Sequence, residues 1–249
     1  MLKDIVYSNN SPECKLDLYL PESDKIEATY IFFHGGGLEA GDKKDFLKIA
    51  EFLLKYNIAV VSANYRMYQN AKFPDYLVDC AAAVKWTLDN AQKYNLKNFC
   101  IGGTSAGGYI TMMLFFNKEY LLNSGVDLSL IKGYLFDAGQ PTCHCNYLKY
   151  EKNIDPRAVL RDETAPIYYL REDYKPEENL PEILITCSDN DIINRKNQLT
   201  MLHTAMLQFN YPEERLTFKI YENEVSHCTY CNKKYYMEDI LAFIIRATK

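Results

Sequence analysis

One short stretch, Gly102–Gly108, constrains the fold of this chain more than any other, because it reads Gly-Gly-Thr-Ser-Ala-Gly-Gly. The apolar run before it, at residues 98–101, predicts a buried strand, and residues 109–116 after it predict a helix. The Gly-x-Ser-x-Gly pattern centred on Ser105 therefore lies at a strand-to-helix corner, where a strained turn projects the serine hydroxyl above a sheet. We interpret Ser105 as a candidate nucleophile. A glycine-rich turn with an exposed serine is the alternative interpretation.

The length and charge of the chain narrow its class. With 249 residues, of which 48% are hydrophobic and 24% charged, the chain is long enough for one large core, and we expect a single domain over 1–249. The 28 basic and 33 acidic residues give a net charge of −5. This balance provides no basic footprint for nucleic acid or for an anionic membrane, so we expect neither as a partner. The oligomeric state is left open.

The first residues show no basic and apolar leader, and no stretch reaches the roughly 18 apolar residues of a membrane helix. We therefore expect a soluble, cytoplasmic protein. The 8 cysteines are scattered along the chain, and reduced thiols are the default expectation for them.

Apolar runs that predict strands alternate with periodic segments that predict helices. The expected strands cover residues 14–20, 28–33, 58–65, 98–101, 131–137, 182–187 and 215–221, and the main expected helices cover 43–56, 75–94, 109–116, 198–209 and 234–247. This alternation predicts an α/β fold with a mostly parallel sheet that is covered by helices on both faces. Residues 138–180 lack periodicity, and we expect them to form a lid-like insertion.

A second glycine motif, His34-Gly35-Gly36-Gly37, directly follows the strand expected at residues 28–33. Glycines leave their backbone N–H groups unobstructed, as the stabilisation of an oxyanion requires. An ordinary glycine turn is the alternative.

A serine nucleophile needs an imidazole as its base, and the chain has 4 histidines. His34 belongs to the glycine loop, and His203 lies on an expected helix. We select His227, which follows the last expected strand, and keep His144 as the alternative.

The catalytic group needs a carboxylate beside the serine and the histidine. We expect this carboxylate on the loop after the strand at residues 182–187, which gives the chain order Ser, Asp, His. That loop offers Asp189 and Asp191. We favour Asp191, because side chains usually become exposed only after the first loop residues, and we expect Asp189 to cap the turn or the next helix.

Taken together, these motifs resemble the α/β-hydrolase fold, in the His-Gly-Gly-Gly esterase and lipase branch related to hormone-sensitive lipase. The resemblance runs from about residue 14 to the end of the chain. It implies that Ser105 attacks an ester carbonyl, that His227 transfers the proton and Asp191 orients it, and that the N–H groups of Gly36, Gly37 and Ala106 hold the oxyanion. The implied activity is a cofactor-free serine carboxylesterase that acts on small acyl esters, acetylated sugars among them, through an acyl-enzyme. The sequence departs from the commonest pattern of this family in two ways. The acidic residue of the catalytic group lies in Ser-Asp-Asn-Asp and not before a proline, which leaves Asp189 open as the acid. The N-terminus is short, which favours a compact esterase over a true lipase.

Three other functions remain open. The segments Cys143-His144-Cys145 and His227-Cys228-Thr229-Tyr230-Cys231 hold residue types that bind zinc, and a zinc ligand at His227 would exclude it from catalysis. The chain could also be a hydrolase-fold protein that only binds a ligand, since fold does not dictate function. A peptidase of the same fold is the third alternative.

Overall fold

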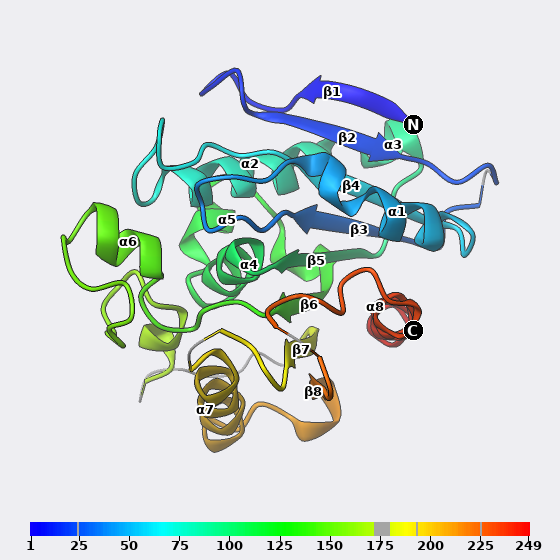
Figure 1. The fold of residues 1–249 in the computed structure, drawn as a ribbon. Helices are drawn as coiled ribbons and strands as arrows, with labels where there is room; N and C mark the ends of the chain where they lie inside the picture. Colours follow the sequence, from blue (N-terminus) through cyan, green and yellow to red (C-terminus); the bar gives the residue numbers. More distant parts are fainter. Residues whose placement is uncertain (24, 172–179, 193, 225) are drawn as a thin grey trace.

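A single sheet organises the molecule (Figure 1). The computed structural model describes residues 1–23, 25–171, 180–192, 194–224 and 226–249. Within these ranges the sheet has 8 strands in the order β1-β2-β4-β3-β5-β6-β7-β8. The strands are β1 (Leu2–Val6), β2 (Lys15–Tyr19), β3 (Ala28–Phe33), β4 (Ile58–Ala63), β5 (Phe99–Thr104), β6 (Ile131–Asp137), β7 (Glu182–Ser188) and β8 (Leu216–Tyr221). The six strands β4, β3, β5, β6, β7 and β8 pair with their neighbours in parallel. Strand β2 is antiparallel to β4, and β1 is antiparallel to β2. The predicted α/β class is confirmed.

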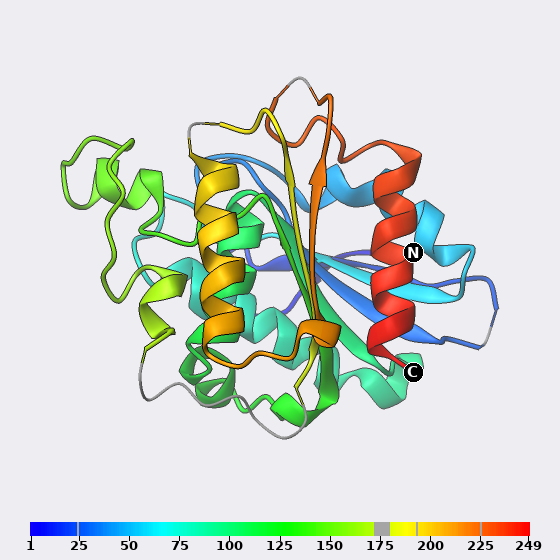
Figure 2. The same ribbon diagram turned by 90° about the horizontal axis from the view of Figure 1, so that it is seen from below.

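Helices cover both faces of the sheet. They are α1 (Leu47–Leu54), α2 (Asp75–Asp89), α3 (Ala91–Tyr94), α4 (Ala106–Phe116), α5 (Glu119–Asn123), α6 (Cys145–Tyr150), α7 (Arg195–Gln208) and α8 (Lys234–Ala247). The apolar sides of α1 and α8 pack on one face, and those of α2, α4 and α7 pack on the other. Figure 2 shows α7 and α8 on opposite sides of the strands. None of the helices in the described ranges combines the length and apolarity needed to cross a membrane.

Helix α4 occupies the middle of its layer. All of its side chains are buried, and it contacts β3, β5 and β6. A helix that is apolar on every side is stable only where protein surrounds it completely. The serine corner before α4 is therefore held between the sheet and a fixed helix.

Three segments differ from the sequence prediction. Strand β1 was not expected, because four of its five residues are exposed and its sequence shows no clear alternation. The helix expected at 43–56 begins with a 3₁₀ turn at Lys43–Phe46. The helix expected at 75–94 divides at Asn90 into α2 and α3.

The expected insertion at 138–180 is partly packed against the body of the protein. Its first residues are buried up to Leu148, apart from the half-buried Cys145, and it contains α6 and a 3₁₀ turn at Pro166–Tyr169. The Tyr109 hydroxyl of α4 donates to the Thr164 carbonyl at 2.8 Å. Residues 172–179 of the expected insertion lie outside the described residues. A lid function for this segment stays a prediction.

Strands β3, β5, β6, β7 and β8 are neighbours in the sheet and run in the same direction. Their carboxyl ends therefore meet at one edge. The loops after these strands carry the glycine motif, Ser105, Asp191 and His227. In open α/β sheets this edge is where ligands bind.

Candidate active site

Ser105 lies between β5 and α4 with φ 57° and ψ −111°, a left-handed backbone conformation that is unusual for a residue with a side chain. Its N–H donates to the Asp137 carbonyl at 2.7 Å. A Cβ atom on Gly103 would clash with the backbone of Gly107, and one on Gly107 would clash with the Phe33 carbonyl. The two glycines of the motif are required because this corner leaves no room for side chains.

The His227 imidazole bridges two of the predicted site residues. Its Nε2 lies 2.7 Å from Ser105 Oγ, and its Nδ1 lies 2.5 Å from Asp191 Oδ1. An ionised carboxylate can only accept, so Nδ1 carries a proton, and in the neutral ring Nε2 accepts from the serine hydroxyl. The three side chains thus form one hydrogen-bonded line, although Ser105 and His227 are 122 residues apart in the sequence.

The two aspartates of the loop after β7 have different partners. The Asp191 carboxylate is fully buried and, besides His227, accepts from the Ile192 N–H at 2.8 Å. Asp189 is half-buried and accepts from the N–H groups of Asn223 at 3.0 Å and Glu224 at 3.3 Å. These backbone bonds hold the pKa of Asp189 below its ordinary value. Asp191 contacts the imidazole, whereas Asp189 fastens the turn after β8.

Opposing effects set the pKa of His227. Burial of the ring lowers it, but the hydrogen bond to Asp191 and the neighbouring Cys228 thiol raise it more, and the pKa of His227 is about 9. The Asp191 carboxylate therefore stabilises the imidazolium that forms when the ring takes up a proton.

The glycine loop passes beside the serine. A Cβ on Gly35 would lie 3.3 Å from Ser105 Cβ, and Gly36 and Gly37 adopt φ of 103° and 67°. Ala106 is the first residue of α4, so its N–H has no acceptor within the helix. The placement of these amides beside Ser105 is compatible with an oxyanion hole at Gly36, Gly37 and Ala106, which stays a prediction.

Two polar residues of this edge were not singled out from the sequence. Asn146 of α6 donates through Nδ2 to the Gly37 carbonyl at 2.6 Å and to Glu39 Oε2 at 2.8 Å. Asp137 at the end of β6 is fully buried and accepts hydrogen bonds from several hydroxyl groups. The sequence does contain a signal for Asp137, because it is an acidic residue at the end of an otherwise apolar strand. No local pattern marks Asn146.

The other histidines have structural contacts. His34 is buried, its ring stacks on Tyr65 at 4.4 Å, and its Nδ1 lies 2.8 Å from the Gly35 carbonyl oxygen. His144 accepts from the Asn146 N–H at 3.2 Å, and burial, together with nearby Arg195, lowers its pKa to about 3. His203 packs against Phe218 at 5.4 Å.

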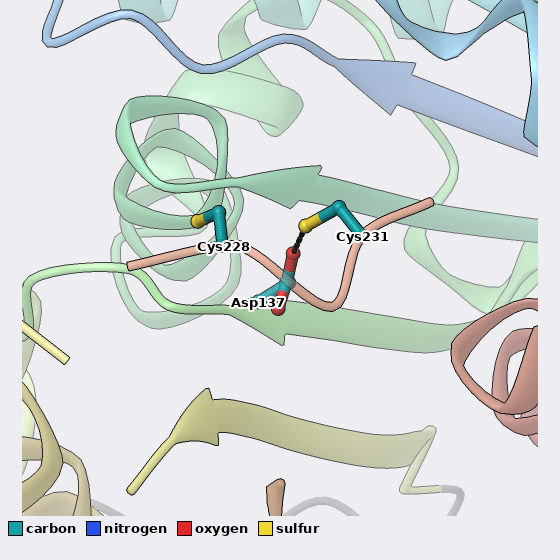
Figure 3. A group of neighbouring side chains, drawn as sticks. All are labelled: Asp137, Cys228 and Cys231. Carbon is teal, nitrogen blue, oxygen red and sulfur yellow. Dashed lines mark hydrogen bonds between the residues drawn. The ribbon is translucent and has the colours of Figure 1, made fainter. Parts of the chain in front are cut away.

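The two Cys/His segments do not join into one metal site. The Cys143 thiol donates to Asp162 at 3.2 Å, and both nitrogens of His227 are engaged by Ser105 and Asp191. Among the described residues, the potential ligands that come together are Asp137, Cys228 and Cys231, whose ligand atoms lie within 4.8 Å of one another (Figure 3).

A pocket of about 340 Å³ opens between the insertion and the start of α7. Its lining includes Gln140, Cys145 and Pro156 on one side and Ile192, Arg195 and Gln198 on the other. Arg195 is buried and donates to the Ala138 carbonyl and, at 3.3 Å, to Gln140 Oε1. The pocket therefore lies at the same sheet edge as Asp191.

Comparison with known proteins agrees with this fold. Residues 16–132 match the family model BD-FAE. A putative alpha/beta hydrolase, R526, of Acanthamoeba polyphaga mimivirus is 22% identical over 262 residues, covering 90% of this chain and 75% of the viral protein. Two other similar proteins are much longer than this chain. The chain covers 35% of the bifunctional GH43-CE protein of Bacteroides eggerthii, and its match to Lipase 2 of Moraxella sp. covers 21% of that lipase.

Solved esterases share the architecture. A truncated carbohydrate esterase from gut microbiota superimposes with a TM-score of 0.77 at 22% identity, over 99% of this chain and 95% of that one. The propionate-bound esterase Est2 of Thermogutta terrifontis has a TM-score of 0.74 at 18% identity, over 97% of this chain and 93% of that one. The chain therefore has the α/β-hydrolase fold that these solved esterases share, and its residues 16–132 resemble the BD-FAE family.

Proposed function

We propose that this chain is a serine carboxylesterase that hydrolyses short acyl esters through Ser105, His227 and Asp191. The observation that carries the proposal is the hydrogen-bonded line from Ser105 Oγ through the His227 ring to Asp191, at 2.7 Å and 2.5 Å. A serine hydroxyl becomes nucleophilic when an adjacent imidazole takes its proton, and the carboxylate holds that ring in the required tautomer.

The reaction proceeds in two halves. Ser105 Oγ attacks the ester carbonyl while its proton moves to His227 Nε2, and the N–H groups of Gly36, Gly37 and Ala106 donate to the developing oxyanion. The tetrahedral intermediate expels the alcohol, which leaves with the proton from His227. Water, deprotonated by His227, then attacks the acyl-enzyme and releases the carboxylic acid and free Ser105.

The preference for a short acyl group is also a proposal. It is supported by the 340 Å³ pocket beside the loop of Asp191, which is close to the lower limit of common ligand pockets. The structural neighbour Est2 is described with bound propionate and butyrate, and another neighbour is a carbohydrate esterase. We infer an ester of acetate, propionate or butyrate, with a sugar as one class of alcohol.

The test is hydrolysis of p-nitrophenyl esters from acetate to decanoate by the purified chain. Ser105→Ala should lower kcat by about 10⁴-fold or more, because the nucleophile itself is removed. Ser124→Ala, at the end of α5, is the matched control and should behave like the unaltered chain. Undiminished turnover by Ser105→Ala would contradict the proposal, and a rate that rises steadily toward decanoate would contradict the short acyl preference.

An amide substrate separates the esterase from a peptidase. Amine leaving groups need more complete protonation than alkoxides, so p-nitroacetanilide should be hydrolysed far more slowly than p-nitrophenyl acetate. Comparable rates for the two substrates would favour the peptidase.

A further inference from the structure

The loop after β8 holds a pair of thiols that the proposed mechanism does not use. Cys228 and Cys231 are separated by Thr229 and Tyr230, and the Cys231 N–H donates to the Cys228 carbonyl at 3.2 Å, which closes a tight turn. Their sulfur atoms and a carboxylate oxygen of Asp137 lie within 4.8 Å of one another. Figure 3 shows the loop with both cysteines passing over the end of β6, where Asp137 lies.

The hydrogen bonds of Asp137 argue against a metal ion at this cluster. Its Oδ1 accepts from the hydroxyls of Thr186 and Tyr230, both at 2.6 Å, and its Oδ2 accepts from those of Thr104 and Tyr236, both at 2.7 Å. Each oxygen thus accepts from two hydroxyl groups, so a metal would have to displace donors that are already well placed. The two cysteines are left as the reactive groups.

The two thiols differ in their surroundings. The Cys231 thiol donates to Asp137 Oδ2 at 3.6 Å, and its contacts with Cys228, its burial and the Asp137 charge raise its pKa. The neighbouring Cys231 thiol, and then the contact with His227, lower the pKa of Cys228. Both side chains keep some solvent exposure. An attacking thiol needs access and a pKa that favours the thiolate; both cysteines are partly accessible, and the lowered pKa favours Cys228 over Cys231 as the attacking thiol.

Cys228 is also the residue next to His227, and its backbone has φ 59°, a left-handed conformation that is strained for a residue with a side chain. Drawing two sulfurs from several ångströms to the 2.05 Å of a disulfide requires rotation or shift of at least one cysteine. Any shift of residue 228 is transmitted directly to the histidine.

We propose that Cys228 and Cys231 are a site of reversible disulfide formation, and that the disulfide lowers ester hydrolysis by displacing His227 from Ser105. The second half of this inference rests on the proposed function, whereas the formation of the bond does not. The oxidant is a small-molecule disulfide such as glutathione disulfide.

The disulfide forms by two successive thiol–disulfide exchanges. The Cys228 thiolate attacks one sulfur of the oxidant, which forms a mixed disulfide and releases the first small thiolate. The Cys231 sulfur then attacks the Cys228 sulfur, breaks the mixed disulfide and releases the second small thiolate. The protons given up by the two cysteines end on the two released thiols, so the oxidant is reduced and the protein dithiol is oxidised.

The experiment equilibrates the full chain in glutathione buffers from fully reduced to fully oxidised. Alkylation of the remaining thiols followed by peptide mass spectrometry reports the bond, and p-nitrophenyl acetate hydrolysis reports activity. We expect a 228–231 disulfide, a fall in kcat of about 100-fold, as expected for a catalytic group displaced by roughly 1 Å, and recovery with dithiothreitol.

Three variants sharpen the test. Cys231→Ser keeps a hydroxyl toward Asp137 and should trap a glutathione adduct on Cys228, whereas Cys228→Ser should form neither the adduct nor the bond. Cys14→Ser, at a buried thiol just before β2, is the matched control and should respond to oxidation like the unaltered chain. If Cys231→Ser does not fold, the order of alkylation in the unaltered chain decides, and Cys228 should react before Cys231.

The outcomes separate the two proposals. If the bond forms but no ester is hydrolysed, the proposed function fails and the thiol site stands. An active, Ser105-dependent esterase without a 228–231 bond in oxidised buffer overturns the thiol site. One zinc ion per purified chain that is lost in Cys228→Ser would also overturn it.

Discussion

The backbone of Ser105 adopts a conformation that only the surrounding chain can enforce. Its φ of 57° costs conformational energy, which the packing of α4 and the bond to the Asp137 carbonyl offset. In return, the hydroxyl is aimed at His227 Nε2. The strained backbone and the predicted nucleophile therefore coincide at Ser105.

The raised pKa of His227 predicts the pH dependence of the proposed ester hydrolysis. The ring accepts the serine proton only when neutral, so kcat/KM should fall about tenfold per pH unit below a midpoint near the pKa of about 9. A pH profile of p-nitrophenyl acetate hydrolysis, corrected for the spontaneous reaction, measures this limb. The free energy of unfolding changes with pH in the opposite direction to the rate. Because the pKa of His227 is higher in the folded state, protonation of the ring stabilises the fold fully below pH 6.5, and this contribution is lost as the pH rises through about 9.

The two neighbouring aspartates provide a matched pair of variants for the same profile. Asp191→Asn removes the hydrogen bond that raises the pKa of His227, so the limb should move to lower pH and kcat should fall by about 10⁴-fold, as for the corresponding change in a serine protease. Asp189→Asn should leave both nearly unchanged, since this side chain bonds the turn at Asn223 and Glu224. The reverse pattern would show that Asp189 is the acid.

At the scale of elements, α6 braces the glycine loop. The Asn146 side chain bridges the Gly37 carbonyl and Glu39, and the Tyr150 hydroxyl also donates to Glu39. The loop that carries the predicted oxyanion donors is thus fixed from the insertion. We assign Asn146 as a positioning residue.

Asn146→Ala should therefore lower kcat by about 10-fold to 100-fold while KM changes little, because the amide groups lose their alignment with the transition state more than with the substrate. Steady-state kinetics with p-nitrophenyl acetate separates the two constants. Lys152→Ala, an exposed change just after the same helix, is the control. A rise in KM with unaltered kcat would instead indicate a substrate contact.

Whether an element could be predicted from the sequence depended on how clearly burial repeats along it. Helix α8 matches the expected range 234–247, because its buried side chains recur at helical spacing. Strand β1 is largely exposed and is held by pairing with β2 at the edge of the sheet, so its sequence has no such pattern. Helix α6 is six residues long, too short for a periodicity to appear.

At the scale of the whole molecule, Asp137 connects the central strands to the C-terminal segment. Its carboxylate accepts hydrogen bonds from the hydroxyl groups of Thr104 in β5, Thr186 in β7, Tyr230 in the loop between β8 and α8 that carries His227, and Tyr236 in α8. These donors converge from far apart in the sequence. The position of His227 relative to Ser105 thus depends on one buried carboxylate.

Asp137→Asn should lower the free energy of unfolding by at least about 2 kcal/mol, because the new amide group faces hydroxyl donors that lose an acceptor. Urea unfolding followed by circular dichroism measures this change. Asp89→Asn, at an exposed pair with Lys85, should stay within about 0.5 kcal/mol of the unaltered chain. Equal stability of the two variants would mean that the four hydroxyl bonds contribute little.

The amino-acid sequence by itself determined the α/β class, the strand-to-helix corner at Ser105 and the selection of His227, because these follow from local periodicity, glycine placement and a small number of histidines. The tertiary structure decided which aspartate faces the imidazole, that Asn146 braces the glycine loop and that Asp137 and the two thiols of residues 228 and 231 gather beside the histidine. The physical reason is that apolar patterning is recorded between near neighbours in the chain. Hydrogen bonds at the sheet edge join side chains from separate strands, so only the register and order of those strands bring them together.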